Sequence, residues 1–101
     1  MDETAGAMKI RLSERASEQL FSAFEYLHTD SARVAVSQMK RIFEAIDLLE
    51  RYPLAGRKGR IEGTREMVVP RTPFIVAYSI AENEVHILAV LHSAQRWPES
   101  L

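Results

Sequence analysis

Two stretches in the C-terminal half of the chain, Phe74–Ile80 and Val85–His92, are almost entirely apolar and are separated only by a short polar turn. Apolar runs of this length, rich in β-branched residues, are typical of strands, and so short a turn joins strands that run antiparallel. In the first stretch, apolar side chains occupy both even and odd positions, so both faces of that strand would be covered. The sequence therefore predicts a hairpin whose first strand lies in the interior of a sheet.

Two further strands complete the predicted sheet. Arg65–Val69 precedes the hairpin and is joined to it through a proline-containing turn, which makes a three-stranded antiparallel meander. Near the N-terminus, Met8–Leu12 alternates apolar and basic residues, as a half-buried strand does. Residues 1–7 have no periodicity, and we expect them to form a flexible tail in front of a single domain, residues 8–101.

Between the N-terminal strand and the meander, apolar residues recur every three and four positions, which is the spacing of amphipathic helices. The first helix should begin after Ser13, whose hydroxyl can cap it, and run to about His28. The second should begin after Asp30 or Ser31 and run almost to Pro53. A link this short makes the two helices antiparallel. The predicted core-facing residues are Ala16, Leu20, Phe24 and Leu27 in the first helix, with Phe21 and Ala23 beside them, and Ala35, Met39, Ile42, Ile46 and Leu49 in the second.

These elements predict an α+β fold. An N-terminal strand, an antiparallel helix pair and a three-stranded antiparallel meander follow one another, and both helices should pack on one face of a single sheet. The chain has no cysteine, which excludes disulfides, thiolate nucleophiles and cysteine-ligated zinc and fits a reducing cytosol. No apolar run approaches the roughly 20 residues that span a bilayer, so we expect a cytoplasmic protein without a membrane partner.

The net charge of −1 hides an uneven distribution. Acidic residues gather in the two predicted helices, whereas the segment that leads from the second helix to the hairpin is rich in basic residues and has only Glu62 and Glu66 as acids. This distribution predicts one basic side of the molecule, although an ordinary solvated loop explains the charges equally well. The basic residues of the segment are Arg51, Arg57, Lys58, Arg60, Arg65 and Arg71.

The end of the last predicted strand is the main candidate for chemistry, because His92 lies there with Arg96 and Trp97 close behind. An imidazole can act as a general acid or base and arginines can hold a phosphate, a combination that would suit a metal-independent ribonuclease. The alternative is that His92 and Trp97 only close the edge of the sheet. Motifs for a metal site, a phosphate-binding loop or a serine nucleophile are missing, so no metal or cofactor is expected. Alternate positions of this strand should face the same side of the sheet, and those in line with His92 are His86, Leu88 and Val90.

Three features follow one another in a characteristic order: the Gly-Thr-Arg-Glu step at residues 63–66, the aromatic-containing hairpin, and a tail in which His92 is followed by Arg96 and Trp97. In this combination the chain resembles the RelE/ParE superfamily of small bacterial toxins over roughly residues 8 to 98. The resemblance implies the toxin of a type II toxin–antitoxin module, which a cognate antitoxin binds and neutralises in a hetero-oligomer.

The resemblance leaves two targets open. RelE-like members cut messenger RNA on the ribosome, and for that branch the resemblance implies His92, Arg65 and Arg96 as catalytic residues. Against cleavage, Ile75 stands where that branch has an arginine, and Trp97 stands where it has a tyrosine. ParE-like members poison DNA gyrase without a known catalytic centre of their own, and we favour this target. A non-toxic domain that binds nucleic acid or protein is a third reading.

Two sets of binding residues follow from the resemblance and the charge distribution. The antitoxin should contribute an amphipathic, acidic segment, which we expect in a groove between the helix pair and the sheet, rimmed by Arg33, Lys40 and Arg41. The target is gyrase or the ribosome with its messenger. It should contact the basic loop, which begins at Gly56 between the second helix and the hairpin, and the tail that follows His92. The candidate target-binding residues are Arg57, Lys58, Arg60, Arg71, Gln95 and Trp97.

Overall fold

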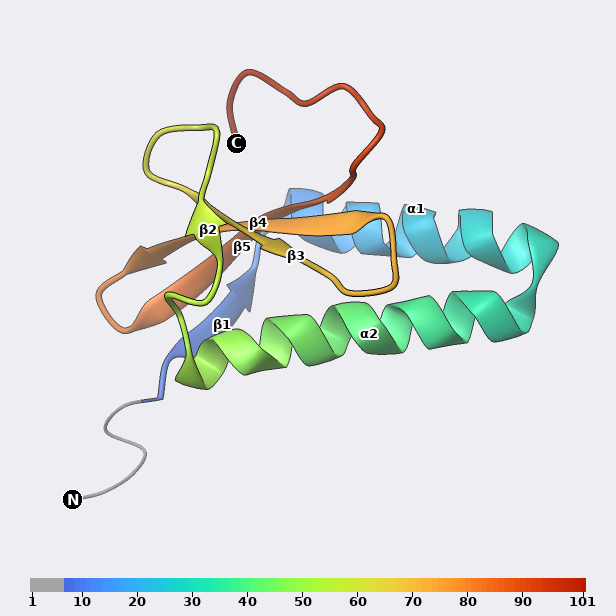
Figure 1. The fold of residues 1–101 in the computed structure, drawn as a ribbon, viewed down its shortest axis with the longest axis horizontal. Helices are drawn as coiled ribbons and strands as arrows, with labels where there is room; N and C mark the ends of the chain where they lie inside the picture. The colour runs from blue at the N-terminus through green and yellow to red at the C-terminus, as the bar shows by residue number, and fades with distance from the viewer. Residues whose placement is uncertain (1–6) are drawn as a thin grey trace.

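The structure, a computed structural model, describes residues 7–101 and has the predicted α+β architecture (Figure 1). The five strands form one sheet in the order β1-β5-β4-β3-β2. β4 therefore lies in the interior of the sheet, as its two apolar faces predict. The elements, in chain order, are β1 (Lys9–Leu12), α1 (Glu14–Asp30), α2 (Ala32–Arg51), β2 (Arg57–Lys58), β3 (Arg65–Val68), β4 (Phe74–Ala81) and β5 (Glu84–His92).

The helix pair connects the two edges of the sheet. β1 pairs parallel with β5, while the other neighbouring strands are antiparallel. Because β1 and β2 lie at opposite edges, α1 and α2 cross one face of the sheet, where they run antiparallel (Figure 1). The short strand β2 is a difference from the sequence prediction, which made Arg57 and Lys58 part of a loop. It forms because β3 offers a free edge with which these residues can pair.

Both helices begin at serine caps. Ser13 and Ser31 each accept a hydrogen bond from the backbone N–H three positions further on, at 3.0 and 3.2 Å. Ser31 also ends α1, since its own backbone N–H donates to a carbonyl of that helix. α1 therefore continues to Asp30, beyond its predicted end at His28.

The helices and the sheet enclose the main core. Tyr78, Ile42 and Leu49 are among its largest fully buried side chains. Phe21 is an exception to the predicted stripe, since it is 64% exposed. The rest of the stripe is confirmed. Ala16, Leu20, Ala35, Ile42, Ile46 and Leu49 are buried, and Ala23, Phe24, Leu27 and Met39 are partly buried.

A β-bulge interrupts β5. The register between β4 and β5 shifts there, and Leu88 has no partner in β4. Residues of α1 and its cap satisfy the backbone groups that the bulge sets free: the Ser13 hydroxyl donates to the Leu88 carbonyl at 3.0 Å, and the N–H of Val90 donates to the Gln19 side chain at 2.8 Å. The bulge is therefore fixed by side chains near the start of α1.

Because of the bulge, the prediction that His86, Val90 and His92 share one face of the sheet is wrong. Ile87 and Val90 both belong to the helix-side core, whereas Ala89 belongs to a separate cluster on the other face. His92 consequently lies on the helix side, while His86 lies on the opposite face. Simple alternation fails because the extra residue of a bulge reverses the facing of every position after it.

The C-terminal segment, residues 93–101, folds back over part of the sheet face that the helices leave free, which we call the outer face (Figure 1). A hydrogen bond of 3.2 Å from Arg15 to the Ser100 carbonyl ties this segment to α1. Of the predicted tail at residues 1–7, only Ala7 lies within the described residues. Across residues 7–101, no helix is both long enough and apolar enough to cross a membrane. The cluster under the C-terminal segment consists of Ala77, Ala89 and Leu91, against which Trp97 and Leu101 pack.

Candidate functional site

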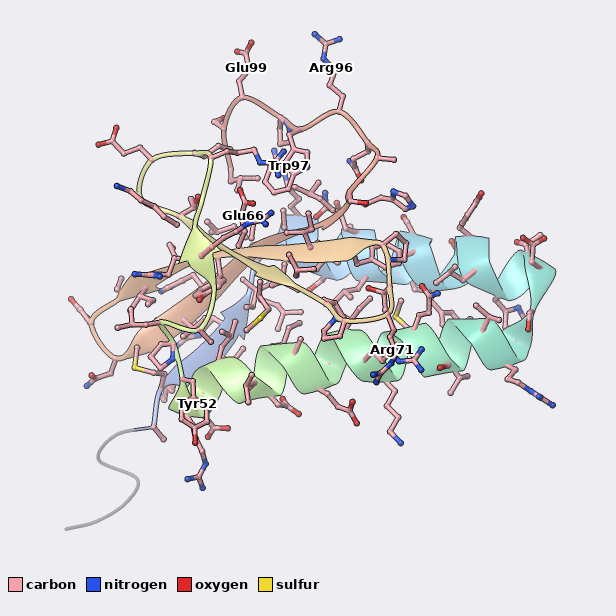
Figure 2. All side chains as sticks on the ribbon, viewed as in Figure 1. Tyr52, Glu66, Arg71, Arg96, Trp97 and Glu99 are labelled. Atoms are coloured by element: carbon pink, nitrogen blue, oxygen red, sulfur yellow. The ribbon has the colours of Figure 1, made fainter. Side chains whose placement is uncertain are left out.

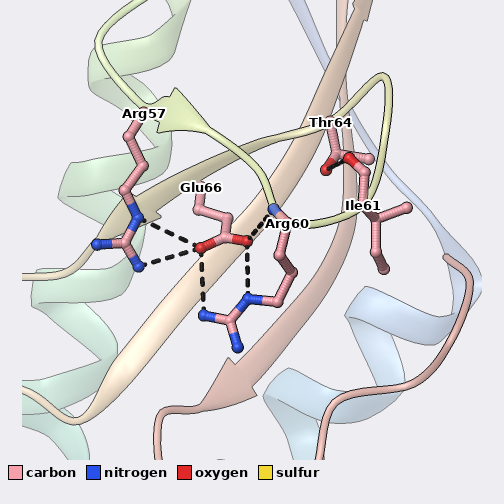
Figure 3. Close-up of polar contacts among 5 residues, drawn as sticks. All are labelled: Arg57, Arg60, Ile61, Thr64 and Glu66. Atoms are coloured by element: carbon pink, nitrogen blue, oxygen red, sulfur yellow. Dashed lines mark hydrogen bonds and ion pairs between the residues drawn. The ribbon is translucent and has the colours of Figure 1, made fainter.

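Glu66 is the centre of a charged cluster on the outer face (Figure 3). β3 places it opposite Ala77, and its side chain is only 3% exposed. Its Oε1 accepts from Arg57 Nη2 at 3.0 Å. Its Oε2 accepts from Arg60 Nε at 3.1 Å and from the Arg60 backbone N–H at 2.9 Å. Both oxygens of a buried carboxylate are thus occupied by two arginines of the preceding segment.

These hydrogen bonds decide the charge of Glu66. Burial disfavours the carboxylate and on its own would raise the pKa of this group. The bonds from the backbone and side chain of Arg60 and from the side chain of Arg57 outweigh burial, so the pKa of Glu66 lies below its ordinary value. Glu66 is therefore ionised at neutral pH. One negative charge between two arginines leaves the cluster with a net positive charge.

Arg60 also contacts the C-terminal segment. Its guanidinium lies 3.6 Å from the centroid of the Trp97 ring, which is a cation–π contact. Trp97 points back toward Glu66, whereas Arg96 and Glu99 point away from the sheet (Figure 2). Arg60 therefore joins the segment that precedes β3 to the C-terminal segment. We call Arg57, Arg60, Glu66 and Trp97 the outer-face cluster.

Tyr78 holds the start of the basic loop, which comprises residues 56–64. Its buried hydroxyl donates to the Pro53 carbonyl at 2.7 Å and accepts from the Gly56 N–H at 2.9 Å, and burial raises the pKa of Tyr78. Arg65 donates to the Gly56 carbonyl at 2.7 Å. A Cβ on Gly56 would lie 2.6 Å from the Tyr78 hydroxyl, so a larger residue would displace the loop. The loop is consequently anchored to the central strand of the sheet.

Only some of the predicted target-binding and catalytic residues are joined by direct contacts. Arg57, Arg60 and Trp97 come together. Lys58 lies directly opposite Arg65 in the pairing of β2 with β3, and neither forms an ion pair within the described residues. Like charges that face each other across strands disfavour the pairing.

The remaining predicted residues lie in the turn after β3, at the end of β5 and in the C-terminal segment, where Gln95 and Arg96 line one open pocket with Trp97. Arg71 lies in the turn after β3 and has a left-handed backbone with φ of 60°. Arg96 is exposed on the C-terminal segment (Figure 2). His92 lies on the helix side, and Gln95 accepts a hydrogen bond of 2.8 Å from its backbone N–H.

The hydrogen bonds of His92 define which ring nitrogen carries its proton. Its Nδ1 accepts from the Ala94 backbone N–H at 3.0 Å, so the neutral ring is protonated on Nε2. The ring also packs edge to face on Phe74, with the centroids 5.7 Å apart. His92 thus stabilises the turn into the C-terminal segment.

An open groove of about 520 Å³ lies between α1 and the ends of β4 and β5. The residues predicted to rim an antitoxin groove, Arg33, Lys40 and Arg41, lie on α2 and do not line this groove. Arg41 instead donates to Ser37 at 3.0 Å. Residues that line the groove include Arg15, Gln19, Ala23, Tyr26, Phe74 and Val90.

Sequence reasoning missed the part that Glu66 has in this site. The sequence shows Glu66 only as one of two acids among many basic residues. The signal that could have found it is its place in a strand beside a central apolar strand, because a carboxylate buried there needs partners of opposite charge. Within residues 7–101, no group of three histidine, aspartate or glutamate residues could hold a metal ion.

Comparison with known proteins connects this fold and site to a family. The sequence model of the ParE toxin of the type II toxin–antitoxin system parDE matches residues 10–97. The chain belongs to the ParE toxin family. It is 40% identical to the toxin candidate Y4kP of Sinorhizobium fredii over 93 residues, which cover 92% of this chain and 96% of that relative. It is 31% identical to Toxin RelE2 of Caulobacter vibrioides over 81 residues, which cover 80% of this chain and 90% of that relative.

A solved structure has the same fold as this ParE-family toxin. A chain of the chromosomal ParDE TA system from P. aeruginosa superposes with a TM-score of 0.77 at 21% sequence identity, over 86% of this chain and 97% of that chain. The family match confirms the RelE/ParE resemblance and makes this protein the toxin component of a type II toxin–antitoxin system.

Proposed function

We propose that this toxin acts in the cytoplasm by binding DNA gyrase with its outer-face cluster, and that it does not cut RNA. The observation that carries the proposal is that the candidate catalytic residues do not converge. The family to which the chain belongs favours the same target, since it is the ParE branch that the resemblance associates with gyrase.

His92 and Arg65 are far apart in the sheet. His92 pairs with Phe74 and Arg65 pairs with Tyr78, on strands that flank β4 from its two sides. At about 3.3 Å per residue along β4 and about 4.8 Å between strands, their backbones lie roughly 16 Å apart. Each side chain is also held by its own hydrogen bonds. This arrangement argues against joint action on one phosphodiester bond.

His92 is also poorly placed to take a proton from RNA. A general base needs a free lone pair within hydrogen-bond reach of the proton that it removes. Nδ1 of His92 already accepts from the Ala94 N–H, and Nε2 carries the proton of the neutral ring. Proton transfer by His92 would therefore require the turn at Ala94 to rearrange first.

The outer-face cluster suits binding to a partner protein. The side chains of Arg57 and Arg60 remain 56% and 48% exposed although both bond Glu66. Arginine and tryptophan are the residues most enriched at the energetic centres of interfaces. Because the cluster is already assembled, binding would immobilise few additional side chains.

Purified gyrase in a supercoiling assay and programmed ribosomes in a messenger-cleavage assay distinguish the two targets. We expect the toxin to inhibit supercoiling and to leave messenger RNA intact. His92→Gln should inhibit gyrase almost as well as the wild type, and His28→Gln, at an exposed position of α1, is its control. Arg57→Ala should inhibit gyrase more weakly.

The relative named Toxin RelE2 makes ribosome-dependent cleavage the second candidate. If His92 acted as a general acid or base, His92→Gln would lower a cleavage rate by about a hundred- to ten-thousand-fold. Messenger cleavage that disappears in this variant would therefore refute the gyrase proposal. An absence of growth inhibition on induced expression would favour a non-toxic binding domain.

We further propose that the antitoxin places an amphipathic segment in the groove beside α1. The groove combines apolar residues such as Phe74 and Val90 with one charge of each sign, Arg15 and Glu18, which fits an amphipathic segment that places an acidic residue opposite Arg15. The antitoxin should therefore contact α1 rather than the predicted rim on α2.

Two exposed aromatic residues of α1 provide a matched test. Tyr26 lines the groove and is 75% exposed, whereas Phe21 is 64% exposed and does not line it. Tyr26→Glu should keep its toxicity but escape neutralisation by the co-expressed antitoxin, and Phe21→Glu should still be neutralised. Loss of neutralisation only on replacing Arg33, Lys40 and Arg41 by alanine would locate the antitoxin on α2 instead.

A further inference from the structure

Glu66 belongs to a series of contacts that joins β3, the basic loop and the C-terminal segment. It lies in β3, it bonds Arg57 in β2, and it bonds Arg60 in the basic loop. Arg60 in turn stacks on Trp97 of the C-terminal segment. Three consecutive contacts therefore run from the sheet through the loop to the end of the chain.

The burial of these groups shows how the connection is built. Glu66 is 3% exposed, whereas the two arginine side chains that bond it are about half exposed. The carboxylate thus fixes the arginines from beneath and leaves their outer edges accessible to a partner. The Trp97 ring is fixed in the same way, because it packs on Ala77, Ala89 and Leu91 of the sheet and contacts Arg60.

The C-terminal segment has few other ties to the sheet. At its start the Ser93 backbone N–H donates to the Pro73 carbonyl at 2.7 Å, and near its end the Ser100 carbonyl accepts a hydrogen bond of 3.2 Å from Arg15 of α1. The Nε1 of Trp97 is buried and has no hydrogen-bond partner among residues 7–101. Between these two hydrogen bonds, the segment is held by the packing of Trp97 and Leu101 on the sheet and by the stack of Arg60 on Trp97.

We propose that Glu66 is a positioning residue, which couples the basic loop to the C-terminal segment by holding Arg60 against Trp97, and that the target recognises the two segments as one joined surface. The second half of this inference rests on the proposed binding of gyrase, while the first half concerns the toxin alone. Glu66 itself is buried and acts through Arg60 and Trp97.

Trp97 is the one tryptophan of the chain, so its fluorescence reports on this contact directly. Glu66→Gln removes the charge and turns one acceptor oxygen into an amide that cannot accept from an arginine. We expect this variant to keep its far-ultraviolet circular dichroism while Trp97 becomes more accessible to acrylamide quenching. Glu62→Gln, an exposed acid in the same loop, is the matched control and should quench like the wild type.

Arg60→Lys provides a second route to the same result. A lysine keeps the positive charge but cannot bond both carboxylate oxygens and stack on the ring with one planar group. It should therefore expose Trp97 as Glu66→Gln does, and it carries the test if Glu66→Gln does not fold. Quenching that stays at the wild-type level in the folded variants would overturn the positioning role.

Gyrase inhibition then tests the second half of the inference. Glu66→Gln should weaken inhibition by about three- to tenfold, the factor expected for the loss of one cation–π contact. Trp97→Ala should weaken it as well, and Glu66→Gln should add little in the Trp97→Ala background, because both changes disrupt the same contact. Glu62→Gln should inhibit normally.

The outcomes separate this inference from the proposed function. A wild-type toxin that does not inhibit gyrase would refute the proposed target, while the quenching result would still decide whether Glu66 positions Trp97. If Glu66→Gln exposes Trp97 but still inhibits gyrase at the wild-type level, the target does not recognise the two segments as one joined surface. Strictly additive losses in the double variant would show that Glu66 acts by a route other than Trp97.

Discussion

The hydroxyl of Tyr78 provides the sharpest test of how the basic loop is held. Tyr78→Phe deletes one oxygen atom from a side chain that is 0% exposed. With it go two hydrogen bonds, the one of 2.7 Å to the Pro53 carbonyl and the one of 2.9 Å from the Gly56 N–H. The ring, and with it the packing of β4, remains.

The expected loss follows from what these two groups can do afterwards. Gly56 is buried, so its N–H would be left without a partner, whereas the bond to the Pro53 carbonyl is only partly buried, so the main cost arises at Gly56. A buried group left unsatisfied costs about 1–3 kcal/mol. In a domain of this size each kcal/mol lowers the melting temperature by roughly 4–8 °C, so we expect a decrease of about 5–20 °C.

Thermal and urea unfolding of Tyr78→Phe measure this loss. Tyr26→Phe makes the same chemical change at a position that is 75% exposed, and it should change stability by no more than about 0.5 kcal/mol. A Tyr78→Phe variant as stable as the wild type would refute the anchoring of the loop by this hydroxyl. Equal losses in both variants would show that the effect has nothing to do with burial.

Four substitutions, studied in three experiments, test the core and the outer-face cluster. Ile46→Asp puts an unpaired charge at a position that is 2% exposed, at a cost on the order of several kcal/mol, and a cooperative melt close to that of the wild type would contradict the predicted core. Because the pKa of Glu66 is lower in the folded chain than its ordinary value of 4.5, its stabilising effect is fully present above that pH and is lost as the pH falls through the folded pKa. The difference in unfolding free energy between the wild type and Glu66→Gln should therefore shrink on acidification below pH 4.5, and a constant difference would count against this ionisation. Arg96→Ala should leave the melting temperature nearly unchanged, whereas Arg57→Ala should lower it, since it deprives a buried carboxylate of one arginine; calorimetry of the two variants compares them.

Most of the fold could be predicted from the sequence because its elements have strong local signals. The caps at Ser13 and Ser31 and the three-and-four spacing of apolar residues define both helices. The two apolar faces of β4 indicate its interior position. These signals depend on neighbouring residues alone, which is why they can be recognised without knowledge of the tertiary structure.

The features that could not be predicted depend on partners distant in the sequence. β2 exists only because Arg57 and Lys58 lie beside a free edge of β3. The bulge at Leu88 is stabilised by Gln19, and it moves His92 to the face that alternation does not predict. The site therefore differs from its prediction more than the fold does, since a single shift of register redistributes the residues expected to act together.

The parallel pairing of β1 with β5 has a consequence for the synthesis of this toxin. The Ser13 hydroxyl, just after β1, donates to the carbonyl of Leu88, which lies 75 positions further along the chain. A chain emerging from the ribosome can form its helix pair early, but the first strand finds its partner only when β5 has been made. The native sheet, and with it the surface assembled around Glu66, therefore forms only after β5 has been synthesised. A chain that stops before β5 leaves its first strand unpaired, so the outer-face cluster depends on a strand made long after the helices.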